Sequence, residues 1–335
     1  MRGTWQKISW TLGLTVAGCL ASWSCSSPGH SAWKANHQQE FNAALAGWLP
    51  LAEEGDADAQ FLVGTLYEQG KGVPLDDAVA AYWYRRSAFQ DYPPAQNNLG
   101  LMYFEGRGVE RSSEKGVELY AKAASSGFAP AQCNLGIVYL YGKSVPQDYE
   151  KGRKLLRASA DQADPKAQRM LGWIYHQGLG VEQNFSKAAH WYHMAADQGV
   201  ASAQFQLGSL YLQGRGVPQN VELAAIRFEQ AAFQGLATAQ TVLGLLYLEG
   251  RGVVQDEAQA VTWLRQAADQ GAALAQYNLG LLYVKGIGVP KDMQEASRWL
   301  QQAANQGLPQ AKEKIDLMRR GQFRPEAIRS SSATP

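Results

Sequence analysis

Apolar side chains recur through most of the chain at the spacing of an α-helix. In one kind of segment, Ala95, Leu99 and Tyr103 stand at positions i, i+4 and i+8 and share one helix face. In a second kind, a small residue lies one turn from a large one, as in Ala188 and Trp191. Such pairs let two helix backbones approach while an aromatic ring fills the gap. The pattern predicts two types of closely packed amphipathic helix.

The two kinds of segment recur together with a period of 36 residues. Residues 59–67 return at 95–103, and five more copies follow without an insertion. Each copy carries a glycine within its first helix: Gly64, Gly100, Gly136, Gly172, Gly208, Gly244 and Gly280. Seven copies in constant phase predict a repeat protein whose unit is a helix pair.

Turn and capping residues mark the predicted helix ends at the same period. The first helix of each copy ends at a glycine, which adopts the left-handed conformation of a helix C-terminus at low cost. These glycines are Gly70, Gly106, Gly142, Gly178, Gly214, Gly250 and Gly286. The second helix begins after a residue that can accept a hydrogen bond from a free backbone N–H. These residues are Asp76, Ser112, Asp148, Asn184, Asn220, Asp256 and Asp292.

One helix pair is too small to bury its own apolar stripe, so adjacent copies must stack and share a core. We therefore expect an all-α protein, an α-solenoid superhelix of seven helix–turn–helix repeats over residues 57–307. A degenerate helix at 39–56 is expected to cap the first repeat. A polar helix at 308–320 is expected to cap the last repeat, with a disordered tail at 321–335.

The first residues have the layout of an export signal. Arg2 and Lys7 precede an uncharged and mostly apolar stretch, which is too short and too polar for a convincing membrane span. The segment Val-Ala-Gly-Cys at 16–19 resembles a bacterial lipobox. It predicts a signal peptide at 1–18 and a lipid on Cys19 that would attach the protein to a membrane.

Other interpretations of this segment stay open. The signal could be cleaved for plain export with an incidental cysteine, it could be processed at Cys25, or the chain could remain unprocessed. We expect a flexible linker at 19–38. The predicted location is the periplasmic face of the membrane for a lipoprotein, or otherwise the periplasm or the outside of the cell.

Charge and cysteine content exclude two further classes. The chain has 31 basic and 30 acidic residues, without the basic surplus of a nucleic-acid-binding protein, so we expect no nucleic-acid partner. Of three cysteines, Cys19 and Cys25 lie at the signal boundary and Cys133 is alone in the repeats. No disulfide framework is therefore expected, and helix packing must stabilise the fold.

The repeated motifs resemble those of the Sel-one-like repeat family, a relative of the tetratricopeptide repeat. The resemblance covers residues 57–307 and rests on Ala-Gln-x-x-Leu-Gly-x-x-Tyr, Gly-x-Gly-Val and Trp-Tyr-x-x-Ala-Ala-x-Gln-Gly. It implies a right-handed superhelix whose first helices line the concave side. It also implies a non-enzymatic adaptor that binds a protein or peptide partner in that groove, in envelope assembly or in contact with host proteins such as immunoglobulin.

An enzymatic function is the alternative that the resemblance raises. A cysteine-rich branch of the family has been linked to penicillin binding or weak β-lactamase activity, but its cysteine pairs are missing here. No Ser/His/Asp or Cys/His set emerges from the sequence. The Gly-x-Gly loops also lack the preceding strand and the Gly-Lys-Ser/Thr ending of a phosphate loop. We expect neither catalysis nor a cofactor.

Three histidines could hold zinc if they converged. His190 and His193 lie on one second helix, and His176 lies on the preceding first helix. His190 and His193, however, flank Trp191 on the expected outer side, and no carboxylate or cysteine stands in register. We expect no metal.

Three positions on one face of the first helix vary between copies, and this face is predicted to line the concave groove. An aromatic side chain between two hydrogen-bonding groups suits an interface hot spot, and Arg169, Trp173 and His176 form such a set. The other predicted groove residues are Phe61, Phe104, Phe205 and Tyr277. Aliphatic residues at these positions could instead pack between neighbouring helices. A groove of this composition favours a peptide or protein segment over a sugar.

Overall fold

The computed structural model describes the backbone of residues 28–142 and 144–320, and side chains from Glu40 onward. Over these residues the chain forms sixteen α-helices and no strand. The helices are α1 (Pro28–Glu54), α2 (Ala57–Gln69), α3 (Asp77–Ala88), α4 (Pro93–Glu105), α5 (Ser113–Ser125), α6 (Ala129–Tyr141), α7 (Tyr149–Ala160), α8 (Pro165–Gln177), α9 (Phe185–Asp197), α10 (Ala201–Gln213), α11 (Val221–Phe233), α12 (Ala237–Glu249), α13 (Glu257–Asp269), α14 (Ala273–Lys285), α15 (Met293–Asn305) and α16 (Pro309–Arg319).

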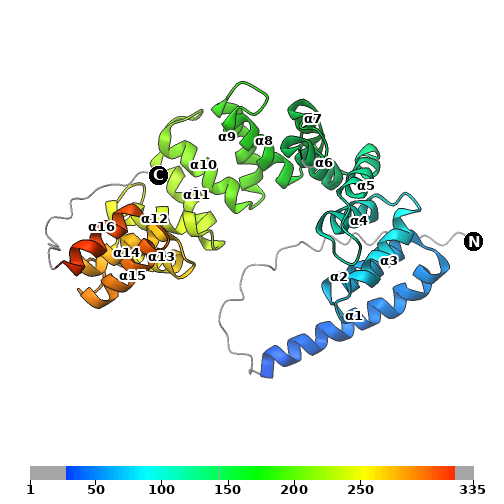
Figure 1. Cartoon of the computed structure of the whole chain (residues 1–335), viewed down its shortest axis with the longest axis horizontal. Coiled ribbons are helices and arrows are strands. Elements are labelled where there is room, and N and C mark those ends of the chain that lie inside the picture. Colours follow the sequence, from blue (N-terminus) through cyan, green and yellow to red (C-terminus); the bar gives the residue numbers. More distant parts are fainter. Residues whose placement is uncertain (1–27, 143, 321–335) are drawn as a thin grey trace, which may run out of the picture.

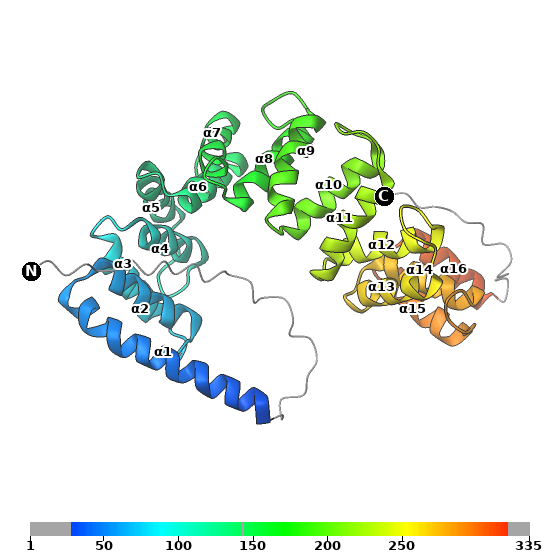
Figure 2. The same ribbon diagram turned by 180° about the vertical axis from the view of Figure 1, so that it is seen from behind.

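The helices form a curved array in which each packs against the one before it and the one after it (Figure 1). Even-numbered helices from α2 to α14 are the first helices of the repeats, and odd-numbered helices from α3 to α15 are the second. In both views, α4 and α6 lie on the inner side of the curve and α5 and α7 on the outer side (Figures 1 and 2). The helices α4 and α6 also contact each other directly. The predicted α-solenoid is confirmed.

The predicted helix ends are confirmed in all seven repeats. Each first helix ends at a glycine in the left-handed conformation, as at Gly214, whose φ is 66°. Each second helix begins after a side chain that accepts a backbone N–H, as when Asn220 Oδ1 accepts from Leu223 N at 2.8 Å. Capping satisfies groups that a helix terminus would otherwise leave without partners.

The second glycine of the turn permits a close approach between repeats. Gly216 also has a positive φ, and a Cβ at this position would lie 2.2 Å from the carbonyl carbon of Phe185. Phe185 is the first residue of the preceding second helix, α9. A side chain at residue 216 would therefore push two repeats apart.

Glycine within the first helix has a different role. A Cβ at Gly172 would lie 2.5 Å from the ring of Tyr192 on the second helix of the same repeat. The Tyr192 side chain is fully buried. The absence of a side chain in α8 thus makes room for a large ring from α9, as close helix packing requires.

A buried glutamine joins three consecutive helices. Gln204 on α10 donates from Nε2 to the carbonyl oxygen of Ala196, near the end of α9, at 3.2 Å. Its Oε1 accepts from Gln234, which follows α11, at 2.8 Å. Gln204 is only 5% exposed, so both bonds involve a buried side chain. The other first helices carry a buried glutamine at the same position: Gln60, Gln96, Gln132, Gln168, Gln240 and Gln276.

The N-terminal cap is longer than expected. Residues 39–54 are helical as predicted, but α1 begins at Pro28, so the linker prediction is wrong for residues 28–38. Proline is favoured in the first turn of a helix, and no glycine interrupts residues 30–46. The predicted cap α16 is present. The signal peptide, Cys19 and the tail at 321–335 lie outside the described residues. Within the described part, no helix is long and apolar enough to cross a bilayer.

Removing the glutamine bridge should destabilise the array. Gln204→Leu would remove two hydrogen bonds, the one to the Ala196 carbonyl and the one from the Gln234 amide. We expect a loss of about 1–3 kcal/mol in the free energy of unfolding, measured by urea denaturation. The exposed Gln213→Leu, on the same helix, should change that value by less than about 0.5 kcal/mol. Equal effects of the two substitutions would show that the bridge contributes nothing.

One turn should be open to stabilisation. Ala163, between α7 and α8, has a φ of 65°, whereas most equivalent turns carry glycine, such as Gly199. Ala163→Gly removes the steric cost of a left-handed alanine, about 1–2 kcal/mol, partly offset by the greater freedom of glycine in the unfolded chain. Thermal and urea unfolding should show a gain of about 1 kcal/mol. The control is the same substitution inside a helix. Ala158→Gly in α7 should lower the free energy of unfolding by about 1 kcal/mol.

Candidate functional site

Seven residues on α4, α6 and α8 form the surface that joins successive first helices. We call them the inner stripe: Asn98, Leu101, Asn134, Ile137, Tyr141, Lys166 and Trp173. None is fully buried, and Tyr141 is 50% exposed. The stripe is therefore accessible to solvent across repeats two to four.

Hydrogen bonds join two residues of the inner stripe, Asn134 and Lys166, to the buried Asn97. Asn134 donates from Nδ2 to Oδ1 of Asn97 at 2.9 Å. Asn134 in turn accepts from the ammonium of Lys166 at 2.8 Å. These contacts connect α4, α6 and α8 side chain by side chain. They hold one positive charge beside amides, which can donate to and accept from a peptide backbone.

Other residues of the inner stripe are apolar or aromatic. The rings of Tyr141 and Trp173 have centroids 6.0 Å apart, although they come from different repeats. Leu101 on α4 is also exposed, at 36%. Paired aromatic rings next to hydrogen-bonding groups are typical of protein interfaces, because they bury a large area with little loss of side-chain freedom.

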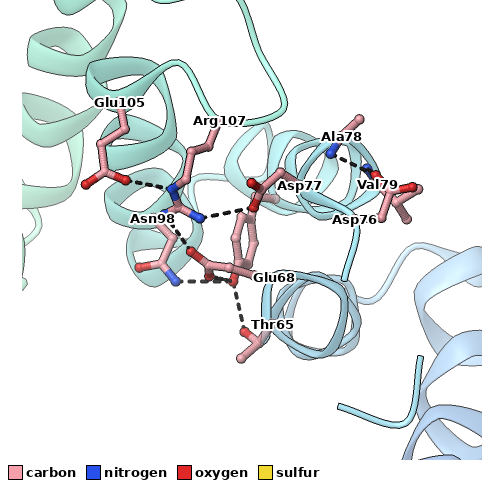
Figure 3. A network of polar contacts seen from close by, with 10 residues as sticks. Thr65, Glu68, Asp76, Asp77, Ala78, Val79, Asn98, Glu105 and Arg107 are labelled. Atoms are coloured by element: carbon pink, nitrogen blue, oxygen red, sulfur yellow. Dashed lines mark hydrogen bonds and ion pairs between the residues drawn. The ribbon is translucent and has the colours of Figure 1, made fainter. Parts of the chain in front are cut away.

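A polar network holds the first repeat against the N-terminal end of the stripe (Figure 3). The Arg107 guanidinium bonds to Glu68 at 2.9 Å and to Asp77 at 3.1 Å. Glu68 also accepts from the hydroxyl of Tyr84 at 2.6 Å, and Asn98 donates to that hydroxyl. Burial, followed by the bond to Glu68, raises the pKa of Tyr84, so its hydroxyl remains a donor. Asn98 thus belongs to both the network and the inner stripe.

Most of the sequence-predicted groove residues lie on a neighbouring face of the first helix. Phe104 stacks on Tyr120 of the second helix in its own repeat, with centroids 5.3 Å apart. Phe61 and Phe205 lie 5.5 Å from Tyr84 and Phe228, also on second helices. These three rings therefore pack inside their own repeats.

The remaining candidates are placed differently from one another. Tyr277 is only 7% exposed and belongs to the core near α15 and α16. Arg169 is half-buried, with its guanidinium 3.3 Å from the sulfur of Met170. Its neighbour Cys133 is a free, buried thiol whose pKa burial raises to about 12. Of the seven predicted groove residues, only Trp173 belongs to the inner stripe.

Sequence reasoning missed four stripe residues, Asn98, Asn134, Tyr141 and Lys166. Successive residues of a helix are turned by 100°. The repeat position of Phe61 and the one seven residues later face the second helix. Asn98 stands one residue after the repeat position of Phe61, so it is turned away from the second helix. The sequence did contain a pattern that could have identified these four residues. Their repeat positions also change from copy to copy, and they carry amide, charged and aromatic residues.

His176 lies between aromatic rings and not in a metal site. Its ring is T-shaped against Phe185 at 5.3 Å and Tyr192 at 6.1 Å. Its Nδ1 is buried without a hydrogen-bond partner. His190 and His193 are exposed, and His193 pairs with Asp197 at 2.8 Å. Among the residues that the structure describes, no three metal-ligating side chains lie close enough to share an ion.

The burial of His176 predicts a pH dependence of stability. Desolvation, assisted by the charge of Arg215, lowers the pKa of His176 below its ordinary value. The unfolded chain therefore takes up a proton near pH ~6.5 that the folded chain resists. Above that pH the neutral histidine contributes fully to the free energy of unfolding. This contribution is lost as the pH falls toward the lowered pKa of the folded state.

His176→Leu, which places the residue of three other repeats at this position, should remove that loss. Thermal unfolding should then show a smaller drop in midpoint between about pH 7.5 and pH 5 than in the unmodified protein. The exposed His190→Thr should leave the drop unchanged. An identical drop in His176→Leu would contradict the assignment.

Comparison with known proteins agrees with this architecture. The family model of the Sel1 repeat matches residues 57–92, 93–128, 129–164, 165–200, 201–236, 237–271 and 273–308. The chain matches no curated protein. It is similar to the crystal structure of a protective antigen present in uropathogenic Escherichia coli strains, which displays an SLR fold. The TM-score is 0.75 and the identity 35%, over 83% of this chain and 60% of that one, so the chain spans less than two thirds of that antigen's length.

The crystal structure of a Sel1 repeat protein from Oxalobacter formigenes is also similar. The TM-score is 0.65 and the identity 38%, over 80% of this chain and 77% of that one. The family model accounts for nearly all of the helical array, from the start of α2 to the residue before α16. The chain belongs to the Sel1 repeat family.

Proposed function

We propose that the protein is a non-enzymatic scaffold that binds a segment of a protein partner along the inner stripe. Sel1 repeat solenoids typically serve as scaffolds for protein interaction. The single observation that carries the proposal is the continuity of side-chain contacts across α4, α6 and α8. Hydrogen bonds join α4, α6 and α8, and the Tyr141–Trp173 pair joins α6 to α8 a second time.

The chemistry of the stripe favours an extended peptide segment. Asparagine amides supply donors and acceptors that match a peptide backbone, and the aromatic pair supplies an apolar anchor. Lys166 adds a positive charge at one end, which favours an acidic group in the partner. The partner is therefore a protein segment with an apolar side chain close to a carboxylate.

We further propose that the partner is met outside the cytoplasm. The support is the signal-like sequence at 1–18 and the lipobox-like segment that ends at Cys19. The similar Escherichia coli protein is described as a protective antigen, which accords with a location outside the cytoplasm. Export would place the inner stripe in the cell envelope or opposite host proteins.

Two substitutions test the stripe with residues that other repeats carry at the same position. Trp173→Ser matches Ser209, and Tyr141→Gln matches Gln177. A hot-spot side chain is worth about 2 kcal/mol or more, so each variant should bind its partner about 30-fold more weakly. Far-ultraviolet circular dichroism should show unchanged helix content.

A photo-cross-linking amino acid at Ile137 would detect the partner directly. Envelope extracts and host secretions should give an adduct at residue 137 that is weakened by Trp173→Ser. The same amino acid at the exposed Leu75, outside the stripe, is the matched control. Adducts of equal strength at both positions, or an adduct that persists in Trp173→Ser, would count against the inner stripe as the site.

A further inference from the structure

At two positions on the second helices, five repeats carry polar or charged residues, whereas the first and the fifth carry apolar or aromatic ones. At the C-terminal end of the second helix, these two repeats carry Phe89 and Phe233. The other five repeats carry Ser125, Asp161, Asp197, Asp269 and Asn305 there. Phe89 is 90% exposed and Phe233 70% exposed. Two large apolar rings thus stand in water at positions that the array elsewhere keeps polar.

The same two repeats differ again seven residues earlier, on the same side of the helix. They carry Tyr82 and Ile226, which are 50% and 48% exposed. The other repeats carry Glu118, Lys154, His190, Thr262 and Arg298 at this position. The apolar character is therefore a property of two helix faces and not of two isolated side chains.

We call the surface on the first repeat face 1 and define it by Tyr82, Arg85, Arg86 and Phe89. It borders a hollow of about 500 Å³ lined by Gly55, Gln60, Arg85, Arg86, Phe89 and Gln90. Arg86 lies 5.2 Å from the ring of Trp83, which holds its charge against the helix. Of the described residues that line this hollow, two are basic and none is acidic.

We call the surface on the fifth repeat face 5 and define it by Ile226, Glu229, Phe233, Val254 and Asp256. It borders a hollow of about 560 Å³ between α11, the turn after α12 and α13. Phe233 packs edge-on against Trp263 of the next repeat at 5.2 Å, and Val254 is 87% exposed. Of the described residues that line this second hollow, two are acidic and none is basic.

We propose that face 1 of one copy of this chain binds face 5 of a second copy. Both faces are apolar and each borders a hollow, so docking buries Phe89 and Phe233 together. Their charges are opposite at the same position of the repeat, since Arg85 and Glu229 stand 144 residues, or four repeats, apart. Docking therefore sets Arg85 and Arg86 against Glu229 and Asp256.

Contact between unlike faces has a definite consequence for assembly. Two copies of face 1 would set arginine against arginine, and two copies of face 5 carboxylate against carboxylate, so like pairs are disfavoured. A head-to-tail contact leaves one free face at each end. It therefore continues into a chain of copies or closes into a ring. The inner stripe belongs to other helices and stays available in such an assembly.

Two single substitutions separate the faces. Phe89→Asp and Phe233→Asp each introduce the residue found at this position in three other repeats, so both variants should fold. Light scattering of the full chain over a concentration series should show a mass that rises above the monomer. Each variant alone should assemble no further than the monomer, because one face of every pair is disabled.

Mixing the two variants is the decisive arm of this experiment. Phe89→Asp keeps face 5 and Phe233→Asp keeps face 1, so the mixture should form a one-to-one complex of twice the monomer mass and nothing larger. Met194→Gln, which places the residue of the next repeat at an exposed position of α9, should assemble as the unmodified chain does.

Charge reversal tests the polar part of the contact independently. Arg85→Glu and Glu229→Arg should each weaken assembly, and the two together in one chain should restore it. Assembly should also weaken with added salt. A full chain that stays monomeric, single variants that assemble like the unmodified chain, or a mixture that stays monomeric would each overturn the proposal. Association through other parts of the chain would persist in both single variants.

Discussion

The structure depends on the buried glutamine of each first helix. Gln168 donates to the carbonyl oxygen of Ala160, at the end of the preceding second helix, and accepts from Gln198 beyond its own second helix. The Ala160 carbonyl also accepts from the backbone N–H of Ala163 in the turn, so the glutamine adds a second hydrogen bond to it. The buried glutamine side chain is itself hydrogen-bonded at both its amide nitrogen and its oxygen, as a buried amide requires. It thereby ties the end of one second helix to the end of the next.

This bridge explains why the array can be long and yet carry separate functional surfaces. Each repeat makes its main contacts with its neighbours only, so stability is close to a sum over interfaces. Residues away from those interfaces can change without disturbing the fold. The inner stripe uses this freedom on α4, α6 and α8, while faces 1 and 5 use it on α3 and α11. A partner segment and a second copy therefore need not compete for the same residues.

The helix ends and the core could be predicted from the sequence because they rest on local chemistry. A glycine at Gly214 or an asparagine at Asn220 has the same conformational preference wherever the repeat lies. The groove residues could not be predicted in the same way. The position of Phe104 varies between copies, which suggested a binding surface, but its ring packs on Tyr120 of the second helix in its own repeat. Variation at a position shows that its surroundings differ between repeats and does not show whether those surroundings are solvent or another helix.

The sequence by itself determined the repeat unit, its 36-residue period and the boundaries of nearly every helix, because turn and capping residues act within a few residues of themselves. Only the tertiary structure decided which side of the first helix is open. Two neighbouring positions on one helix, turned by 100° from each other, can show the same sequence pattern. Only the packing of a second helix decides which of the two side chains is buried and which is exposed. The pairing of Tyr141 with Trp173 depends likewise on the angle between neighbouring repeats. That angle is set by contacts such as the one between Gly216 and Phe185, which join residues of adjoining repeats.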